Sequence, residues 1–97
     1  MPILQCSSPD GFSKEIDLAE VGEVSVGRSP DNTLTEGGHA LSRRHSLVIH
    51  ADGITVVRDM NSSNGTFLNG EEVHRPRILS HGDVVTCGEL SMTFYSD

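Results

Sequence analysis

Basic residues are scarce in this sequence of 97 residues: 7 Lys and Arg stand against 14 Asp and Glu, which gives a formal net charge of -7 at pH 7. Phosphate backbones select basic surfaces, so this balance argues against DNA or RNA as a partner. Long apolar runs are also lacking, since no window approaches the ~20 apolar residues of a membrane span. The first six residues have neither the basic start nor the apolar run of a signal peptide. We therefore expect a cytoplasmic protein, or a domain of a larger one, that does not contact membranes.

Cysteine is sparse as well, with Cys6 and Cys87 in apolar surroundings near opposite ends of the chain. Two such cysteines do not make a disulfide framework, and we expect them to be small core residues in a reducing compartment rather than a bridged or redox pair. The length suits one domain, residues 1–97, because a second core of its own would not fit. One site is the corresponding expectation.

Lysine is almost absent, and arginine supplies six of the seven basic residues. The planar guanidinium fork of arginine matches the geometry of a carboxylate or a phosphate. Arg43 and Arg44 are adjacent and follow Ser42 directly. This grouping predicts a local cationic spot on an acidic body.

Stretches of helical period are missing, and apolar residues come in short alternating bursts closed by Gly, Pro, Ser or Asp. Eight or more strands with such even spacing predict an all-β sandwich or barrel. The longest stretches without a strand signal are residues 27–45, 58–65 and 71–80, and we expect binding there. The predicted strands are 3–6, 12–18, 24–26, 46–49, 54–57, 66–68, 84–87 and 90–95.

Turn signals are abundant between these strands. The pairs Asn64-Gly65 and Asn69-Gly70 enclose a three-residue strand, and both residue types tolerate positive φ. Asp10-Gly11 and Asp52-Gly53 predict further hairpin connections, and we expect the last two strands to pair. Polar side chains on loops of fixed shape are well placed to bind a ligand.

Three loops carry a set of residues that suits a phosphorylated peptide. Arg28 ends one strand, Ser42 and Arg43 follow in the same connection, and Asn64 precedes a later strand. A phosphomonoester carries about -1.5 to -2 charges and three strong acceptors, which guanidinium and hydroxyl donors satisfy. The carboxamide of Asn64 can pair with the main chain of a peptide. Singly, these residues are a solvated arginine, a turn-capping serine and an ordinary turn, so the prediction depends on their joint occurrence.

Together these motifs make the chain resemble a forkhead-associated (FHA) domain, the phosphothreonine-recognition sandwich. The matching residues span positions 3–95 and comprise Gly27-Arg28, Ser42-Arg43-Arg44-His45, Asn64-Gly65-Thr66, Asn69-Gly70, Gly82-Asp83 and Cys87-Gly88. The resemblance implies a two-sheet β-sandwich of about eleven strands whose apical loops bind a phosphothreonine-containing protein or peptide in Ser/Thr kinase signalling. It implies no enzymatic activity, no cofactor and no metal.

The resemblance also assigns roles by position. Arg28 would contact phosphate and peptide backbone, Ser42 would donate to a phosphate oxygen, Arg43 would add an ionic contact, and Asn64 would hold the peptide main chain. Ser63 stands where threonine is common in the family and keeps the hydroxyl. His45 would brace the loops from beneath without touching ligand, and Gly27 and Gly65 would give the backbone shapes needed. Ala40 replaces a basic residue that some relatives carry, so the sequence preference beyond the phosphothreonine stays open.

Other functions are weighed against this interpretation. Ser42 and His45 could be a nucleophile and base, but residues i and i+3 on a loop seldom align and no Gly-x-Ser-x-Gly elbow is present. A metal site from His39, His45 and His50 fits no known ligand spacing. The more serious alternative keeps the fold but makes the domain a phospho-independent scaffold, or a regulatory domain that docks onto its own parent protein.

Overall fold

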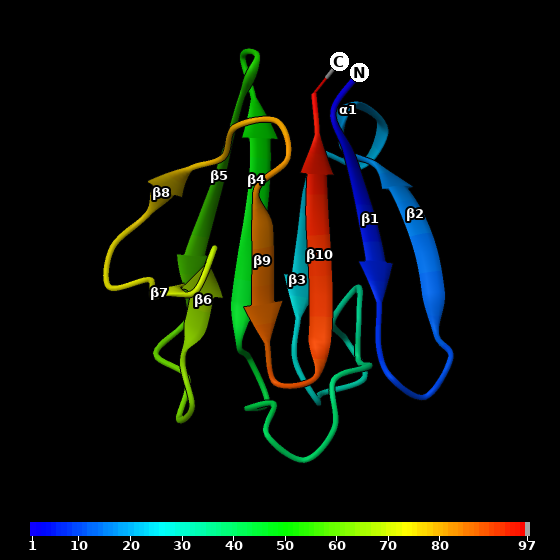
Figure 1. The fold of residues 1–97 in the computed structure, drawn as a ribbon, viewed down its shortest axis with the longest axis vertical. Helices are drawn as coiled ribbons and strands as arrows, with labels where there is room; N and C mark the ends of the chain where they lie inside the picture. The colour runs from blue at the N-terminus through cyan, green and yellow to red at the C-terminus, as the bar shows by residue number, and fades with distance from the viewer. Residues whose placement is uncertain (97) are drawn as a thin grey trace.

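Two antiparallel sheets packed face to face make up the fold in the computed structural model, which describes residues 1–96 (Figure 1). One sheet has six strands in the order β2-β1-β10-β9-β6-β7, and the other has four in the order β3-β4-β5-β8. The strands are β1 Ile3–Ser7, β2 Ser13–Asp17, β3 Glu23–Val26, β4 Ser46–Ala51, β5 Ile54–Asp59, β6 Thr66–Leu68, β7 Glu71–Glu72, β8 Arg77–Ile78, β9 Val84–Cys87 and β10 Leu90–Tyr95.

The predicted sandwich is confirmed, and all eight predicted strands are present. Residues 1–96 hold ten strands, against the eleven or so that the family resemblance implied. The two additional strands, β7 and β8, lie in the stretch 71–80 where we expected a loop. Each is two residues long, which is too short for an alternating pattern to be recognised.

A four-residue helix, α1 (Leu18–Val21), replaces the last residue of the predicted strand 12–18. The Asp17 side chain accepts a hydrogen bond from the Ala19 N–H at 3.0 Å and so caps the helix start. Gly22, with a φ of 78°, ends it. No helix within residues 1–96 is long and apolar enough to cross a bilayer.

Alternate residues of both sheets point inward and form a single aliphatic core. Both cysteines belong to it as free, buried thiols, as predicted, and burial raises the pKa of each to about 11. The buried apolar residues are Leu4, Cys6, Ile16, Leu18, Val24, Val26, Leu34, Leu41, Val48, Val57, Leu68, Val73, Leu79, Val85, Cys87, Leu90, Met92 and Phe94.

Two of the predicted turns are hairpins with positive φ at both turn residues. Asp52 and Gly53 have φ of 53° and 77° and join β4 to β5, while Asn69 and Gly70 have φ of 51° and 86° and join β6 to β7. Such primed turns match the twist of the strands they connect. The last two strands, β9 and β10, also pair as expected.

The connections that carry the predicted site residues gather at one end of the sandwich, the lower end in Figure 1. We call the β3–β4 connection (residues 27–45) and the β5–β6 connection (residues 60–65) the apical loops. Met1 and Ser96 lie at the opposite end, where the amino group of Met1 donates a hydrogen bond to the Ser96 carbonyl at 3.1 Å. The apical loops are therefore remote from these two residues.

Gly27 fixes the start of the longer apical loop through close packing rather than unusual backbone angles. A Cβ atom at this position would lie 2.1 Å from the carbonyl oxygen of Arg43 and 2.7 Å from the Asn32 amide nitrogen. The N–H groups of Arg28 and Ser29 donate across this contact to the carbonyls of Ser42 and Arg43, at 2.9 and 3.2 Å. The absence of a side chain at Gly27 thus lets the two ends of the loop lie side by side.

Gly27→Ala is expected to lower the free energy of unfolding by about 2–4 kcal/mol, because backbone atoms must move to admit the methyl group. Gly53→Ala is the matched control: its Cβ meets open space, so only the positive φ of 77° opposes it, at about 1 kcal/mol. Urea unfolding of both variants measures the difference. Equal losses would show that the close contact at Gly27 does not limit stability.

Candidate functional site

Arg28 and Arg43 share a hollow at the apical end. The hollow has a volume of about 430 Å³ and is lined by Arg28, Ser29, Pro30 and Arg43. The Arg28 N–H donates to the Ser42 carbonyl, which places this arginine beside the predicted serine. The structure therefore brings together two guanidinium groups and the Ser42 segment, residues that are up to 15 positions apart in sequence.

The two arginines are held differently. Nε of Arg28 donates to the Leu41 carbonyl at 2.7 Å, which fixes the guanidinium against the loop and leaves its terminal N–H groups without a partner among residues 1–96. The Arg43 side chain is exposed and likewise has no partner within that range. Its neighbour Arg44 lies 3.4 Å from Asp31 in an exposed ion pair. Of the adjacent arginines, only Arg43 keeps an uncompensated charge at the hollow.

The hydroxyl of Ser42 connects the two apical loops. It accepts a hydrogen bond from the backbone N–H of Ser63 at 2.9 Å. Because a hydroxyl can accept and donate at once, its proton remains available for an anion. Ser63 itself is exposed at the same rim.

Asn64 adds a second connection between these loops. Its side-chain Nδ2 donates to the Ala40 carbonyl at 2.9 Å. We predicted that this amide would pair with a ligand, whereas the structure places one of its donors on the protein itself. The side-chain oxygen Oδ1 has no partner among residues 1–96, so it can still accept a hydrogen bond from a peptide N–H.

His45 lies fully buried beneath the apical loops. Its Nδ1 accepts a hydrogen bond from the Ser42 N–H at 3.1 Å, which leaves the proton on Nε2, and Nε2 donates to the Gly65 carbonyl at 2.7 Å. This is the bracing position that the family resemblance implied. The imidazole meets the backbone of Ser42 and not its hydroxyl, so the pair is not arranged as a nucleophile and base.

Sequence reasoning missed the carboxylate that shapes the β5–β6 loop. Asp59 accepts from the Ser62 hydroxyl at 2.6 Å, the Ser62 N–H at 2.9 Å and the Thr66 hydroxyl at 2.7 Å. The Ser62 hydroxyl in turn accepts from the Gly65 N–H at 2.9 Å, and Ser46 lies 2.6 Å from the Thr66 hydroxyl. The spacing Asp-x-x-Ser at a strand end is the local signal that could have indicated this turn.

The ionisation of Asp59 responds to this network. Burial favours the neutral acid, but hydrogen bonds from Ser62 and Thr66 outweigh it. The pKa of Asp59 is therefore held below its ordinary value. The Asp59 carboxylate and His45, which is hydrogen-bonded through both ring nitrogens, together fix the loop geometry.

Metal ligation does not account for the histidines. Among residues 1–96, no group of three or more His, Cys, Asp or Glu side chains is placed to hold a metal ion. His45 is occupied on both ring nitrogens, and Nδ1 of His50 lies 2.8 Å from the Thr55 hydroxyl.

Comparison with known proteins identifies the arrangement. A family model described as the FHA domain matches residues 24–88. The ABC transporter ATP-binding/permease protein Rv1747 of Mycobacterium tuberculosis is 40% identical over 73 residues, which are 75% of this chain and 8% of that protein. The oxoglutarate dehydrogenase inhibitor of Corynebacterium diphtheriae is 34% identical over 71 residues, 73% of this chain and 49% of that protein. The chain thus spans half or less of the length of these curated relatives.

Solved structures agree with the family match. An FHA domain studied for phosphothreonine-dependent FHA domain interactions superposes with a TM-score of 0.78 at 26% identity, covering 97% of this chain and 94% of that one. The likeness therefore extends over both sheets and the apical loops.

Asp59→Asn is expected to lower the free energy of unfolding at pH 7 by about 1–3 kcal/mol, because the neutral amide cannot accept all three hydrogen bonds. The pKa of Asp59 is lowered in the folded state, so its stabilising effect is present above the ordinary value of 3.8 and is lost as the pH falls through the folded-state pKa. The difference between variant and wild type should shrink in urea titrations carried from pH 7 to about pH 3.

Asp52→Asn, in the exposed β4–β5 turn, is the control for this prediction, since asparagine also tolerates the φ of 53° there. It should follow the wild type at every pH. A gap between Asp59→Asn and wild type that stays constant with pH would contradict the assigned role of the charge.

Proposed function

The chain belongs to the FHA domain family, and from this membership we propose that it is a phosphothreonine-peptide recognition module in Ser/Thr kinase signalling. The observation that carries the proposal is the convergence of Arg28, Ser42 and Arg43 on one rim of an acidic body. The partner is a protein or peptide that carries phosphothreonine, in another protein or in the parent of this chain. No catalytic step is part of the function.

Electrostatics supports phosphate as the recognised group. With a net charge of -7, most of this surface repels a dianion, so local donors must overcome that repulsion. Hydrogen bonds between ionised partners are about twice as strong as neutral ones. The terminal N–H groups of Arg28, the hydroxyl proton of Ser42 and the unpaired Arg43 supply such donors. Ser63 adds a hydroxyl at the same rim.

Preorganisation supports the same conclusion. The two apical loops are already joined by Ser42 with Ser63, by Asn64 with Ala40, and by His45 beneath them. Loops ordered before binding reduce the conformational entropy lost on association. In the complex, Oδ1 of Asn64 would accept from a peptide N–H and hold the main chain next to the phosphothreonine.

The cysteine chemistry agrees with a cytoplasmic setting for this interaction. Cys6 and Cys87 are free, buried thiols. Disulfides are rare in the cytosol, where thiols are kept reduced.

Arg28→Ala is expected to weaken binding of a phosphothreonine peptide by on the order of 2 kcal/mol, or about 30-fold, because a charge-assisted hydrogen bond to the phosphate is lost. Isothermal titration at fixed salt measures the effect. Arg77→Ala is the matched control, since it also removes one arginine but one that pairs with Glu71 at 3.2 Å outside the apical loops.

Phosphatase treatment of the peptide should abolish binding to the wild type. If the Arg28→Ala substitution or the phosphatase treatment leaves the affinity unchanged, the result supports the phospho-independent scaffold instead.

A phosphothreonine peptide is expected to bind more tightly than its phosphoserine twin, if the threonine methyl is buried between the apical loops. One buried methyl contributes about 0.8 kcal/mol, or roughly 4-fold, and a well-shaped pocket contributes more. Side-by-side titration of the two peptides measures the ratio. Equal affinities would exclude an apolar niche for the methyl group.

A further inference from the structure

The outer faces of the two sheets differ in chemistry. Most outward positions of β1, β9 and β10 in the six-stranded sheet carry hydroxyl or amide residues, at Gln5, Ser7, Thr86, Ser91 and Thr93, and the others carry Ile3, Val84 and Tyr95. This is the ordinary pattern for an antiparallel sheet with one face in water. The outer face of the six-stranded sheet therefore serves as the comparison for the outer face of the four-stranded sheet.

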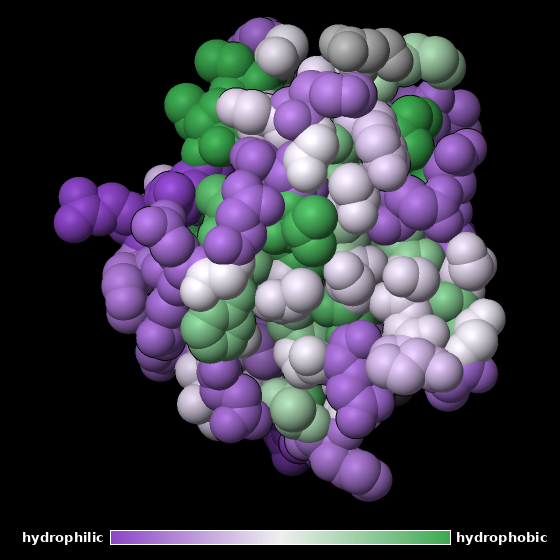
Figure 2. Space-filling model, in the orientation of Figure 1, coloured by the Kyte–Doolittle hydropathy of each residue, from purple (hydrophilic) through white to green (hydrophobic). Residues whose placement is uncertain are grey.

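The four-stranded sheet departs from that pattern. Apart from Arg58 on β5, the large outward side chains of β4, β5 and β8 are aliphatic, and we call this set the aliphatic face: Leu47, Ile49, Ile54, Val56 and Ile78. Ile49 pairs with Val56 and Val56 with Ile78 across the strands, so the residues form a continuous row. Ile54 is 50% exposed and Ile78 is 66% exposed. Figure 2 shows apolar side chains at the rim near the β4–β5 hairpin and β8, at upper left.

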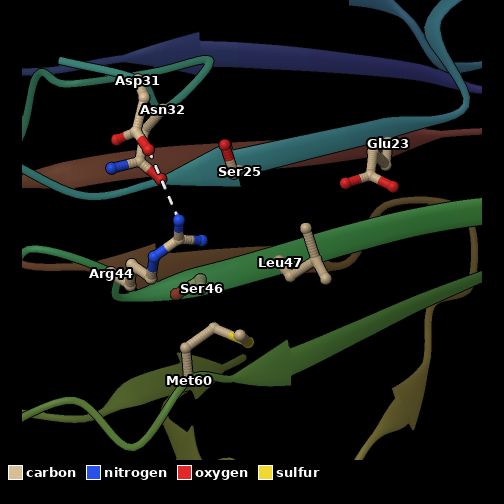
Figure 3. A pocket seen from close by; sticks show the side chains of 8 residues that line it. All are labelled: Glu23, Ser25, Asp31, Asn32, Arg44, Ser46, Leu47 and Met60. Atoms are coloured by element: carbon tan, nitrogen blue, oxygen red, sulfur yellow. Dashed lines mark hydrogen bonds and ion pairs between the residues drawn. The ribbon is translucent and has the colours of Figure 1, made fainter. Parts of the chain in front are cut away.

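A hollow of about 250 Å³ adjoins the aliphatic face between β3 and β4 (Figure 3). Glu23 and Ser25 line it from β3, and Leu47 lines it from β4. The Arg44–Asp31 ion pair spans its apical end. The face therefore has an isoleucine projecting at one edge strand, β8, and a depression beside the other edge strand, β3.

We propose that the aliphatic face joins two copies of this chain in a two-fold dimer. Contiguous exposed aliphatic surface marks an interaction site, and a two-fold interface must be complementary to itself. In the strand order β3-β4-β5-β8, an axis parallel to the strands and between β4 and β5 exchanges β3 with β8. The same axis brings Ile78 of each copy to the Glu23 end of the hollow beside β3 of the other, because Ile78, Val56, Ile49 and Glu23 lie at one level across the strands.

The charged side chains around the aliphatic face suit binding of a second copy of the chain. Glu23 and Asp31 are balanced there by Arg44 and Arg58, so the patch is neutral although the chain carries -7. Arg58 pairs with Leu47 across β4 and β5. The two-fold axis places Arg58 of one copy over Leu47 on β4 of the other, so that Glu23 lies on the adjacent strand, two residues further along it. Opposite charges thus approach each other twice in the dimer.

The size of the face determines the expected strength. Four strands spaced about 4.8 Å apart and up to about six residues long cover roughly 20 by 20 Å, or about 400 Å². A stable complex buries about 800 Å² on each partner. The dimer is therefore weak and depends on concentration. Asp31 and Arg44 of the longer apical loop border the interface, whereas Arg28, Ser42 and Arg43 do not line the hollow beside β3.

Sedimentation equilibrium of the chain from about 5 µM to 1 mM tests the proposal, with dissociation constants in that range expected for so small an interface. The mass should rise from monomer to dimer. Ile78→Thr, which keeps the charge, and Ile78→Asp should each raise the dissociation constant at least ~10-fold, because each substitution acts twice in a symmetric dimer. Ser7→Asp adds the same charge as Ile78→Asp on the six-stranded sheet and should leave the constant unchanged.

Charge reversal provides a second readout. Arg58→Glu should weaken the dimer, and Glu23→Arg combined with Arg58→Glu should restore it. A wild type that stays monomeric up to 1 mM, or Ile78 variants that associate like Ser7→Asp, would overturn the proposal. Phosphothreonine-peptide affinity of the Ile78 variants should equal that of the wild type, so failure here is separable from failure of the proposed function.

Discussion

The buried imidazole of His45 is the contact on which the apical end depends. One ring nitrogen accepts from the Ser42 N–H and the other donates to the Gly65 carbonyl, so a single side chain sets the separation of two loops that are 20 residues apart. The Ser42–Ser63 and Asn64–Ala40 hydrogen bonds require that separation. The donors at the rim are therefore arranged by interactions below the surface, and the exposed side chains need little ordering of their own.

Local signals account for the parts of the fold that were predicted correctly. Asp52-Gly53 and Asn69-Gly70 favour primed turns regardless of what surrounds them, and alternation is visible in strands of three to six residues. The strands β7 and β8 depend instead on pairing with β6 and β5. A segment of two residues is too short to show alternation of apolar and polar side chains. These two strands form because the neighbouring strands of the sandwich are there to pair with them.

The candidate site was predictable to the extent that its residues follow one another in a fixed order along the chain. Arg28, Ser42, Arg43 and Asn64 were selected as candidates in this way, and the structure gathers their segments at one end. Their hydrogen-bond partners were not, because the carbonyls of Ala40 and Leu41 carry no side-chain signal. Asp59 was missed for a related reason: an aspartate at a strand end has many ordinary roles, and only its contacts with Ser62 and Thr66 distinguish it.

Met1 and Ser96 meet at the end of the sandwich that faces away from the apical loops. Because these two residues are adjacent, the domain can be inserted into a surface loop of a larger protein with little distortion of that loop or of the domain. The recognition end would project outward from such a host. Linkers attached near Met1 and Ser96 would then fix the orientation of the domain and leave the apical loops accessible.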